Sequence, residues 1–346
     1  MMPQYFDRQE TRAPHSREAA LLRDLRAIVA IAKARAPALR RQIKGIDIAS
    51  IKTRADLARI PVLREADLRT FAAEEPPFGG LVATRASALR RLIMSQGPVF
   101  EPEGHAKDWW GAARALCAAG FSRGDIVLNC FSYHLASDGF IMDSGANALG
   151  CAVIPAGTVD LELLLETIRT LKPTAYCGRP DFLLSLVEYA KQCRANISSI
   201  TRAVVAGTQL PAGLHRDLES QGICVRQAYR IPRLGIIAYE SEGPDGELNE
   251  GMVVNEGLIL EIVAPGTDEP VRAGEIGEVV VTRLNPDYPL LRFGTGELSA
   301  LLPGISPCGR TNLRVRGCLG PVEKTESTVN SSVAAIPVPG LADSHF

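Results

Sequence analysis

The spacing of apolar and polar residues changes along the chain, and its first part predicts helices. Between residues 16 and 44 the apolar positions recur at helical spacing behind Ser16, a residue type that caps helix N-termini. A loop and a short helix are expected next, and they lead into residues 60–62. We therefore predict that residues 1–87 form a region of helices and loop.

From about residue 88, short apolar runs rich in β-forming residues alternate with stretches of helical spacing. The runs lie at 89–95, 125–133, 151–157, 174–178, 202–207 and 223–229. The helical stretches lie at 106–119, 138–149, 160–171, 180–194 and 211–221. This alternation is typical of a sheet built from βαβ units with helices on its faces. An α/β body is therefore predicted up to about residue 240.

The pattern changes again after residue 250. The segments GLILEIVAP, GEIGEVVVTRL and YPLLRFGTG predict short strands joined by turns, in an antiparallel, barrel-like lobe over residues 250–320. Together with the α/β body, this lobe makes one large domain over residues 88–320. Residues 321–346 are polar, contain Ser, Thr and Pro, and have no sustained periodicity, which predicts a loose tail.

The composition narrows the class of protein. Apolar residues make up 46% and charged residues 22%, which is ordinary for a globular chain with a buried core. A formal net charge of −1 argues against a protein that coats nucleic acid. No apolar run approaches the roughly 18 residues of a membrane span, and the start, MMPQYFDRQE, is unlike a signal peptide. The eight cysteines show no CxxC pair and no Cys/His metal spacing, so we expect a cytoplasmic protein without a metal-ligating cluster.

One segment near the end of the chain carries the strongest functional motif. It reads RFGTGE over residues 292–297 and CGRT over residues 308–311. These motifs resemble the R-x-x-T-G-D and C-G-R-T motifs of phenylacetate–CoA ligases, a branch of the adenylate-forming enzymes. The resemblance implies that Glu297 replaces an Asp that holds both ribose hydroxyls of ATP, since a carboxylate can accept two hydrogen bonds at once. It also implies a catalytic role for Arg310.

The resemblance covers roughly residues 5–320 and begins at Tyr5-Phe6-Asp7, in a region that is expected to wrap the large domain. It implies an α/β fold, the large N-terminal domain of the adenylate-forming enzymes, with mixed, largely parallel sheets, flanking helices and a small antiparallel lobe. It also implies ATP or AMP, Mg²⁺ and CoA as cofactors and a carboxylic acid, aromatic in this branch, as substrate. A homodimer is one assembly that the resemblance leaves open.

The phosphate-binding loop of the resemblance falls on residues 95–104 and is only partly kept. Ser95 and Gly97 fit a loop that wraps a triphosphate with hydroxyl and backbone N–H groups. Two prolines in the segment remove N–H donors. Glu101 and Glu103 place negative charge where phosphate oxygens are expected.

Two further motifs of the resemblance flank the adenine. The small-residue turn falls on Ala206, Gly207 and Thr208, although an ordinary strand-to-helix turn explains Gly207 equally well. The tyrosine turn, Y-G-x-T-E, falls on Tyr229 to Arg233, where the tyrosine is expected to stack on adenine.

In the tyrosine turn, Pro232 stands where the resemblance has a threonine that contacts phosphate, and Arg233 where it has an acid that holds Mg²⁺. An arginine cannot ligate a metal cation. Arg233 therefore either impairs the use of Mg·ATP or neutralises phosphate itself, and we treat it as a second catalytic candidate.

By resemblance, the acid binds near Tyr133 and His134, across from Gly178. A lone histidine beside a strand end is also commonly structural or exposed. The stretch Asp143-Ser144-Gly145 lacks the G-x-S-x-G pattern of a hydrolase and reads as helix.

Three hypotheses follow. The first is an acyl-adenylate-forming ligase that transfers the acyl group to CoA. The second is a catalytically inactive relative that binds nucleotide or acid, and the third is a truncated gene product. After Gly320 too few residues follow for the small C-terminal domain that the resemblance implies, so we expect this domain to be absent and thioester formation to suffer.

Overall fold

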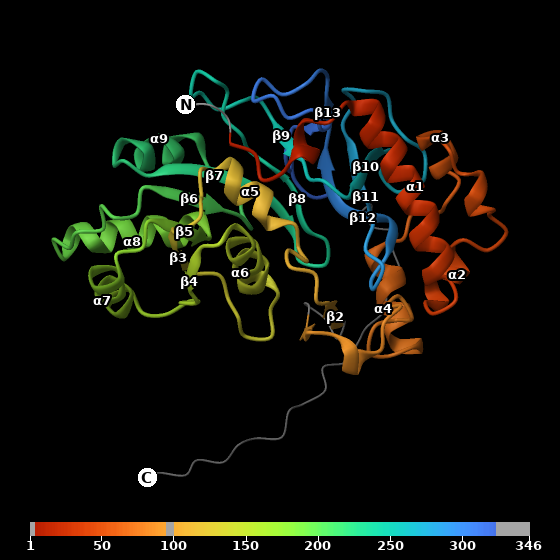
Figure 1. Cartoon of the computed structure of the whole chain (residues 1–346), viewed down its shortest axis with the longest axis horizontal. Helices are drawn as coiled ribbons and strands as arrows, with labels where there is room; N and C mark the ends of the chain where they lie inside the picture. Colours follow the sequence, from red (N-terminus) through yellow and green to blue (C-terminus); the bar gives the residue numbers. More distant parts are fainter. Residues whose placement is uncertain (1–3, 95–99, 323–346) are drawn as a thin grey trace, which may run out of the picture.

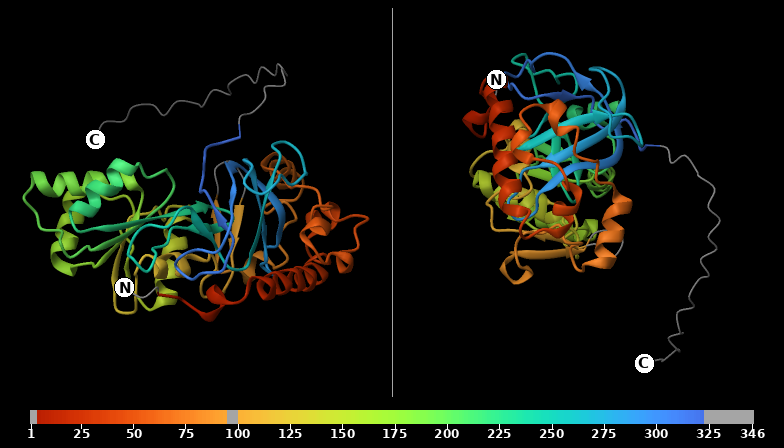
Figure 2. Two further views of the ribbon diagram at one scale, coloured as in Figure 1. Left: turned by 90° about the horizontal axis from the view of Figure 1, so that it is seen from above. Right: turned by 90° about the vertical axis from the view of Figure 1, so that its right-hand side faces the viewer.

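The computed structural model describes residues 4–94 and 100–322, and the predicted loop residues Ser95 and Gly97 lie outside this part. Three parts follow one another across the molecule: an α/β part, a lobe of antiparallel strands, and the N-terminal helices (Figure 1). A second view from above shows the same order, with the lobe between the other two parts (Figure 2).

The first part of the chain is helical, as predicted, but its longest helix is interrupted. The helical stretch predicted over 16–44 is in fact two helices, because Pro37 cannot continue a helix and begins a new one instead. The elements here are η1 (Arg8–Thr11), α1 (Pro14–Ala32), α2 (Pro37–Gln42), η2 (Ile48–Ser50), α3 (Arg54–Leu57), α4 (Glu65–Glu74) and η3 (Ala86–Ala88).

The α/β part contains a sheet of nine strands in the described structure, in the order β13-β14-β9-β8-β7-β6-β5-β3-β4. These strands are β3 (Ile126–Asn129), β4 (Ala152–Ile154), β5 (Ala175–Gly178), β6 (Arg202–Val205), β7 (Cys224–Ile231), β8 (Gly235–Tyr239), β9 (Met252–Val254), β13 (Leu301–Leu302) and β14 (Arg314–Val315). Strands β4, β3, β5, β6 and β7 are parallel, and the pairs from β7 to β13 are antiparallel. A mixed sheet with flanking helices was predicted from the sequence, but it was expected to be largely parallel, whereas four of its eight described strand pairs are antiparallel.

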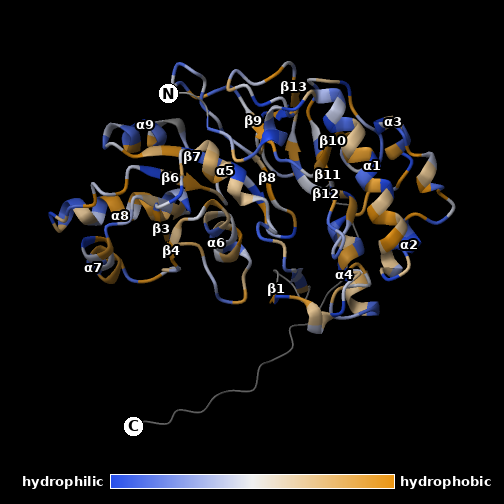
Figure 3. Ribbon diagram, in the orientation of Figure 1, coloured by the Kyte–Doolittle hydropathy of each residue, from blue (hydrophilic) through white to orange (hydrophobic). Residues whose placement is uncertain are grey.

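Helices cover both faces of this sheet. They are α5 (Ala112–Ala118), α6 (Asp138–Leu149), α7 (Leu161–Leu171), α8 (Pro180–Gln192) and α9 (Ala212–Ser220). Successive residues of a strand point to opposite faces. On β5, Cys177 accordingly joins the apolar cluster of α5 and α6, whereas Tyr176 joins the cluster of α7, α8 and α9. Strand β5 is buried at every position, and Figure 3 shows much of the sheet in the orange of hydrophobic residues.

Helix α5 is shorter than the stretch predicted over 106–119. It begins after Gly111, which has a left-handed backbone with φ of 72°. The Asp108 carboxylate accepts hydrogen bonds from the N–H groups of Ala112 and Ala113, at 2.9 and 3.0 Å, and so satisfies donors of the first turn. The other predicted helices of the α/β part agree with the structure to within two residues at each end.

The antiparallel lobe is also present, as β10 (Leu258–Val263), β11 (Gly277–Arg283) and β12 (Leu290–Ser299). Ile259 and Leu291 from the lobe share an apolar cluster with α1 and with the segments around it. A parallel bridge joins Leu63 to Phe293 on β12. The lobe therefore holds the N-terminal helices against the molecule. No helix in residues 4–94 and 100–322 is long and apolar enough to cross a membrane.

A separate hairpin precedes α5. Strands β1 (Arg91–Met94) and β2 (Phe100–Glu103) pair antiparallel, with Met94 opposite Phe100. Of the segment predicted to bind phosphate, residues 95–104, the described part begins with the second strand of this hairpin.

Candidate functional site

Two adjoining pockets lie at the ends of β5 and β6, where the parallel strands finish. The first, which we call the β7 pocket, has a volume of about 210 Å³. Its lining residues are Gly207, Thr208, Gln209, Gln227, Ala228, Tyr229, Arg230, Met252, Glu297, Cys318, Leu319 and Gly320. The carboxyl ends of parallel strands are where open α/β sheets commonly bind ligands.

The second pocket, which we call the Arg233 cavity, has a volume of about 500 Å³. It is lined by Glu65, Met94, Glu101, Ala136, Ser137, Asp138, Arg179, Gly207, Arg230, Ile231, Pro232, Arg233, Phe293 and Thr295. Gly207 and Arg230 belong to both linings, so the two pockets are neighbours along the end of the sheet.

The shared wall is made by the turn after β6 and by a bulge in β7. Gly207 has φ of 96°, a conformation that side-chain-bearing residues rarely adopt. A Cβ atom at this position would lie 3.6 Å from Nη2 of Arg230. The pairing of β7 with β8 shifts between Tyr229 and Arg230, and such bulges redirect side chains.

Gln227 ties the turn to the strand. Its Oε1 accepts a hydrogen bond from the N–H of Leu210 at 3.1 Å, and its Nε2 donates to the Thr208 carbonyl at 3.3 Å. Sequence reasoning missed this residue. Its position two residues before Tyr229, on a period of two, was the signal that could have found it.

The β7 pocket contains two buried oxygens that make no hydrogen bond in the described structure, the Tyr229 hydroxyl and Oε2 of Glu297. Burial, together with the nearby negative charge of Glu297, raises the pKa of Tyr229 above its ordinary value. The phenol therefore stays protonated and can act as a donor. Burial and Glu297 also raise the pKa of Cys318, which shares the pocket, to about 11.

The Arg233 cavity is lined by three arginines and three carboxylates. Arg230 is ion-paired with Asp138 at 2.5 Å. Arg233 lies farther from its two carboxylate partners, at 3.6 Å from Glu65 and 3.9 Å from Glu101. The third arginine, Arg179, pairs with Asp181, a residue outside the cavity, at 2.8 Å.

Arg233 is buried and keeps its charge. Although burial lowers its pKa, Tyr288 and Glu101 raise it above the ordinary value. Its Nη1 atom is buried and has no hydrogen-bond partner among the described residues. For Glu101, burial raises the pKa to about 7 against the opposing effect of Arg233.

The structure brings together five of the predicted site residues. Gly207, Thr208, Tyr229 and Glu297 line the β7 pocket, and Arg233 lines the adjoining cavity. Sequence reasoning missed several other lining residues, among them Glu65, Asp138, Arg230 and Thr295. Glu65 and Asp138 precede β7 by many residues, so no local spacing pointed to them.

Other predicted residues lie elsewhere. Ala206 is fully buried beside the turn and is not among the lining residues of either pocket. Tyr133 packs edge-on against Phe140, and its hydroxyl accepts a hydrogen bond from Asn129 at 2.7 Å. His134 is exposed, and neither it nor Gly178 is among the lining residues.

The expectation for one of the two glutamates of the predicted phosphate-binding segment needs correction on physical grounds. Glu103 does not confront a phosphate, because its carboxylate pairs with Arg91 at 2.6 Å inside the hairpin. Glu101, in contrast, does line the Arg233 cavity.

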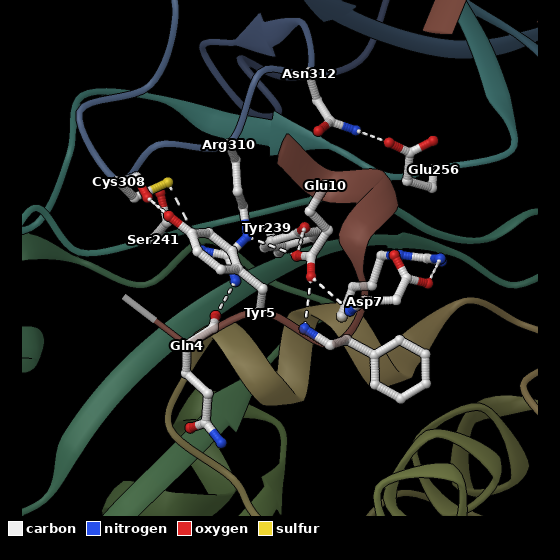
Figure 4. Close-up of polar contacts among 12 residues, drawn as sticks. Gln4, Tyr5, Asp7, Glu10, Tyr239, Ser241, Glu256, Cys308, Arg310 and Asn312 are labelled. Atoms are coloured by element: carbon white, nitrogen blue, oxygen red, sulfur yellow. Dashed lines mark hydrogen bonds and ion pairs between the residues drawn. The ribbon is translucent and has the colours of Figure 1, made fainter. Parts of the chain in front are cut away.

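Arg310, for which the resemblance implied a catalytic role, lies in a buried cluster (Figure 4). Its Nε pairs with Glu10 at 2.7 Å, and its Nη2 donates to the Gln4 carbonyl at 2.6 Å. Its guanidinium also lies 5.1 Å from the ring centre of Tyr5 and 5.8 Å from that of Tyr239. Arg310 therefore fastens the N-terminal segment and is not among the residues that line the two pockets.

The fold and the pockets define an α/β protein with two adjoining pockets at the carboxyl ends of parallel strands, lined among others by a tyrosine, a carboxylate and buried arginines. The chain belongs to the AMP-binding enzyme family, whose profile matches residues 109–285.

The relatives reported next, which are similar to this chain in sequence, are phenylacetate-coenzyme A ligases. The chain is 29% identical to a phenylacetate-coenzyme A ligase of Thermus thermophilus over 309 residues, 86% of this chain and 68% of that protein. It is 26% identical to the phenylacetate-coenzyme A ligase of Escherichia coli K12, over 79% of this chain and 64% of that protein. A third such ligase, from Pseudomonas putida, is 28% identical, and the chain spans 58% of it. The chain thus spans about two thirds or less of these relatives.

Solved structures of CoA ligases share the fold of this chain. An open conformation of 2-hydroxyisobutyryl-CoA ligase, in complex with 2-HIB-AMP and CoA, superposes with a TM-score of 0.83 at 26% identity. The match covers 92% of this chain and 77% of that one. An anthranilate CoA ligase, 17% identical with a TM-score of 0.51, shares the fold.

Proposed function

We propose that this chain binds ATP across the two pockets, activates a carboxylic acid as its acyl-adenylate, and passes the acyl group to CoA. The proposal rests on one observation. Tyr229 and Glu297 line the same pocket, and the Tyr229 hydroxyl and Oε2 of Glu297 have no hydrogen-bond partner in the described structure. Buried polar groups are nearly always hydrogen-bonded. Two orphaned ones in a pocket therefore favour a ligand that supplies both a donor and an acceptor, as a nucleoside does.

The two pockets suit the two ends of the nucleotide. The Tyr229 ring offers an apolar face to the base, and the Glu297 carboxylate can accept hydrogen bonds from ribose hydroxyls. The phosphates then extend past Gly207 and Arg230 into the Arg233 cavity, where the acid substrate also binds. Phe293, Met94 and Ile231 give this cavity apolar walls, which favours an aromatic acid.

The reaction is written in two steps. A carboxylate oxygen of the acid attacks the α-phosphorus of ATP, the bond to the bridging oxygen breaks, and pyrophosphate leaves with that electron pair. The sulfur of CoA then attacks the acyl carbonyl and loses its proton to solvent. AMP leaves with the electrons of the mixed-anhydride bond, and a thioester remains.

A second candidate function is nucleotide or acid binding without turnover. It is favoured by Arg233, which stands where the resemblance has a metal-holding acid. The homodimer that the resemblance leaves open stays a prediction, and so does the cytoplasmic location expected from the cysteines and the N-terminal sequence. The division into residues 1–87, 88–320 and 321–346 is likewise a prediction.

Acid-dependent exchange of labelled pyrophosphate into ATP tests the proposal. We expect exchange with one or more aryl acids from a panel that also contains aliphatic acids of matched size. Exchange with aliphatic acids alone would contradict the aromatic assignment. ATP binding by calorimetry without exchange would favour the second candidate. No binding of ATP or AMP at all would overturn both.

A further inference from the structure

The Arg233 cavity has the properties of an anion site. Arg233 is 5% exposed, and its Nη1 is buried without a hydrogen-bond partner in the part of the chain that the structure describes. A buried guanidinium that leaves an N–H group unsatisfied is costly, and an anionic ligand relieves that cost. The cavity of about 500 Å³ beside it has room for such a group.

The other two arginines of the cavity are already neutralised at close range. Arg230 contacts Asp138 at 2.5 Å, and Arg179 makes hydrogen bonds of 3.0 and 2.8 Å to the two carboxylate oxygens of Asp181. Arg233, by comparison, reaches its carboxylate neighbours only at 3.6 and 3.9 Å. Because Coulomb attraction falls with distance, Arg233 is the least neutralised of the three arginines that line the cavity.

The side chain at position 233 does not fit Mg²⁺, and the described residues contain no group of three or more His, Cys, Asp or Glu that could hold a metal ion. A magnesium ion requires oxygen ligands at about 2.1 Å in octahedral geometry. Arg233 offers five N–H donors and no acceptor, and it holds a fixed positive charge where an acid is needed. A divalent cation here would face this buried guanidinium directly. The chain therefore departs from the metal-holding arrangement that its resemblance implies.

We propose that the Arg233 guanidinium binds a phosphate group of the adenine nucleotide directly, so that nucleotide affinity in this chain does not depend on a divalent cation. The inference rests on the proposed function, which places the nucleoside in the β7 pocket. The guanidinium fork matches phosphate oxygens in shape, and the lining shared through Gly207 and Arg230 leads from that pocket to Arg233. The proposal gives Arg233 a binding role of its own.

Calorimetric titration of the whole chain with adenosine, AMP and ATP, each in EDTA and in Mg²⁺, tests the inference. We expect AMP to bind more tightly than adenosine, and the AMP dissociation constant to change less than about twofold between EDTA and Mg²⁺. Arg233→Gln is expected to weaken AMP binding by about tenfold or more, the scale of a charge-assisted hydrogen bond, and to leave adenosine binding unchanged.

Two further variants sharpen the result. Arg169→Gln removes the same charge from α7, at a side chain that is 79% exposed, and is expected to change nothing. Arg233→Lys keeps the charge without the fork and is expected to fall between the wild type and Arg233→Gln. Thermal unfolding of each variant shows whether it is folded, and the EDTA comparison on the unaltered chain needs no variant.

The outcomes separate the inference from the function. AMP binding that requires Mg²⁺, or that Arg233→Gln leaves intact, overturns the inference and leaves the proposed function standing. If Arg233→Gln instead abolishes binding of phenylacetate alone and spares AMP, the anion at Arg233 is the substrate carboxylate, and the inference is wrong. If neither adenosine, AMP nor ATP binds, both the function and the inference fail.

Discussion

At the level of single residues, Tyr229 and Glu297 show that missing hydrogen-bond partners can point to a binding site. The Tyr229 hydroxyl and Glu297 Oε2 are both buried without a hydrogen-bond partner in the described structure. In general, a buried polar group without a partner costs a folded protein about 1–3 kcal/mol. A ligand that pairs with them recovers this free energy, which is why their position in one pocket favours binding over packing.

Glu297→Ala is expected to weaken AMP and ATP binding by about 1–3 kcal/mol, because it removes a charge-assisted acceptor. The same change is expected to leave the free energy of unfolding unchanged or slightly higher, since Oε2 has no bond to lose in the described structure. Calorimetry and urea denaturation measure the two effects. Glu247→Ala, in an exposed turn, is the matched control. Unaltered nucleotide affinity would contradict the ribose assignment.

Arg310→Ala is expected to destabilise the fold by about 3–5 kcal/mol, because it leaves the fully buried Glu10 carboxylate without its cation. Urea denaturation measures the loss, with the exposed Arg169→Ala as control. At a temperature where the variant stays folded, nucleotide affinity is expected to match the wild type. A variant of normal stability that no longer binds nucleotide would restore the catalytic role that the sequence predicted for Arg310.

At the scale of elements, α1 is held by packing rather than by capping. Its N-cap, Ala13, makes no side-chain hydrogen bond, whereas Leu25 is fully buried in the cluster that reaches Ile259 and Leu291 of the lobe. Short isolated helices are marginal in water, so the buried face of α1 supplies most of its stability.

Leu25→Ala is expected to reduce the free energy of unfolding by about 2–5 kcal/mol, because it removes buried methyl groups and leaves a cavity. Ile31→Ala, on the same helix but 63% exposed, is expected to change it by less than about 0.5 kcal/mol. Urea denaturation of both variants makes the comparison. Equal effects of the two changes would show that α1 does not pack against the lobe as described.

Elements could be predicted from the sequence because their signals are local. The apolar run at 174–178 became β5, and the helical spacing at 138–149 became α6 without any change of bounds. Distant pairings could not be predicted. Glu10 and Arg310 are 300 residues apart in the chain, and a charged residue pattern does not reveal which opposite charge it meets after folding. The resemblance implied a catalytic role for Arg310 from a sequence motif alone. A motif does not show which distant residues contact Arg310 in the folded chain.

Some residues of the candidate site could likewise be predicted from local sequence, and others could not. Tyr229 and Glu297 were found from motifs, and the structure places both in one pocket. Glu65 and Asp138, which face Arg233 and Arg230, come from α4 and α6 and could be recognised only after folding. Local sequence thus identified the groups that contact the nucleoside in the proposed function, but not the charges that set the electrostatics of the cavity.

At the scale of the whole molecule, burial dominates the titration of the carboxylates. Among the described residues, burial raises the pKa of six acids, while hydrogen bonds lower the pKa of Asp56 and Asp181 on the surface. The six are Glu101, Glu103, Asp108, Asp143, Glu240 and Glu261. A carboxyl group whose pKa is higher in the folded chain binds more protons there than in the unfolded chain.

The sign follows from proton linkage. Where the folded chain binds more protons than the unfolded chain, the free energy of unfolding falls as pH rises. For Glu101 the window runs from its ordinary pKa of 4.5 to its folded value of about 7. The stability lost across that window is about 3 kcal/mol, from about 1.4 kcal/mol for each pH unit. Below the window the acid is protonated in both states, and above it the acid is ionised in both.

We therefore expect the chain to be more stable at about pH 5 than at about pH 8, contrary to a protein whose carboxylates are held in salt bridges. Urea denaturation across this range measures the slope. Glu101→Gln is expected to reduce the difference in the free energy of unfolding across this pH range by about 3 kcal/mol. The reason is that the amide is neutral at every pH and mimics the protonated acid. Glu247→Gln, in the exposed turn, is expected to leave the slope unchanged. A Glu101→Gln variant with the wild-type slope would mean that Glu101 stays ionised, held by Arg233 and Arg283.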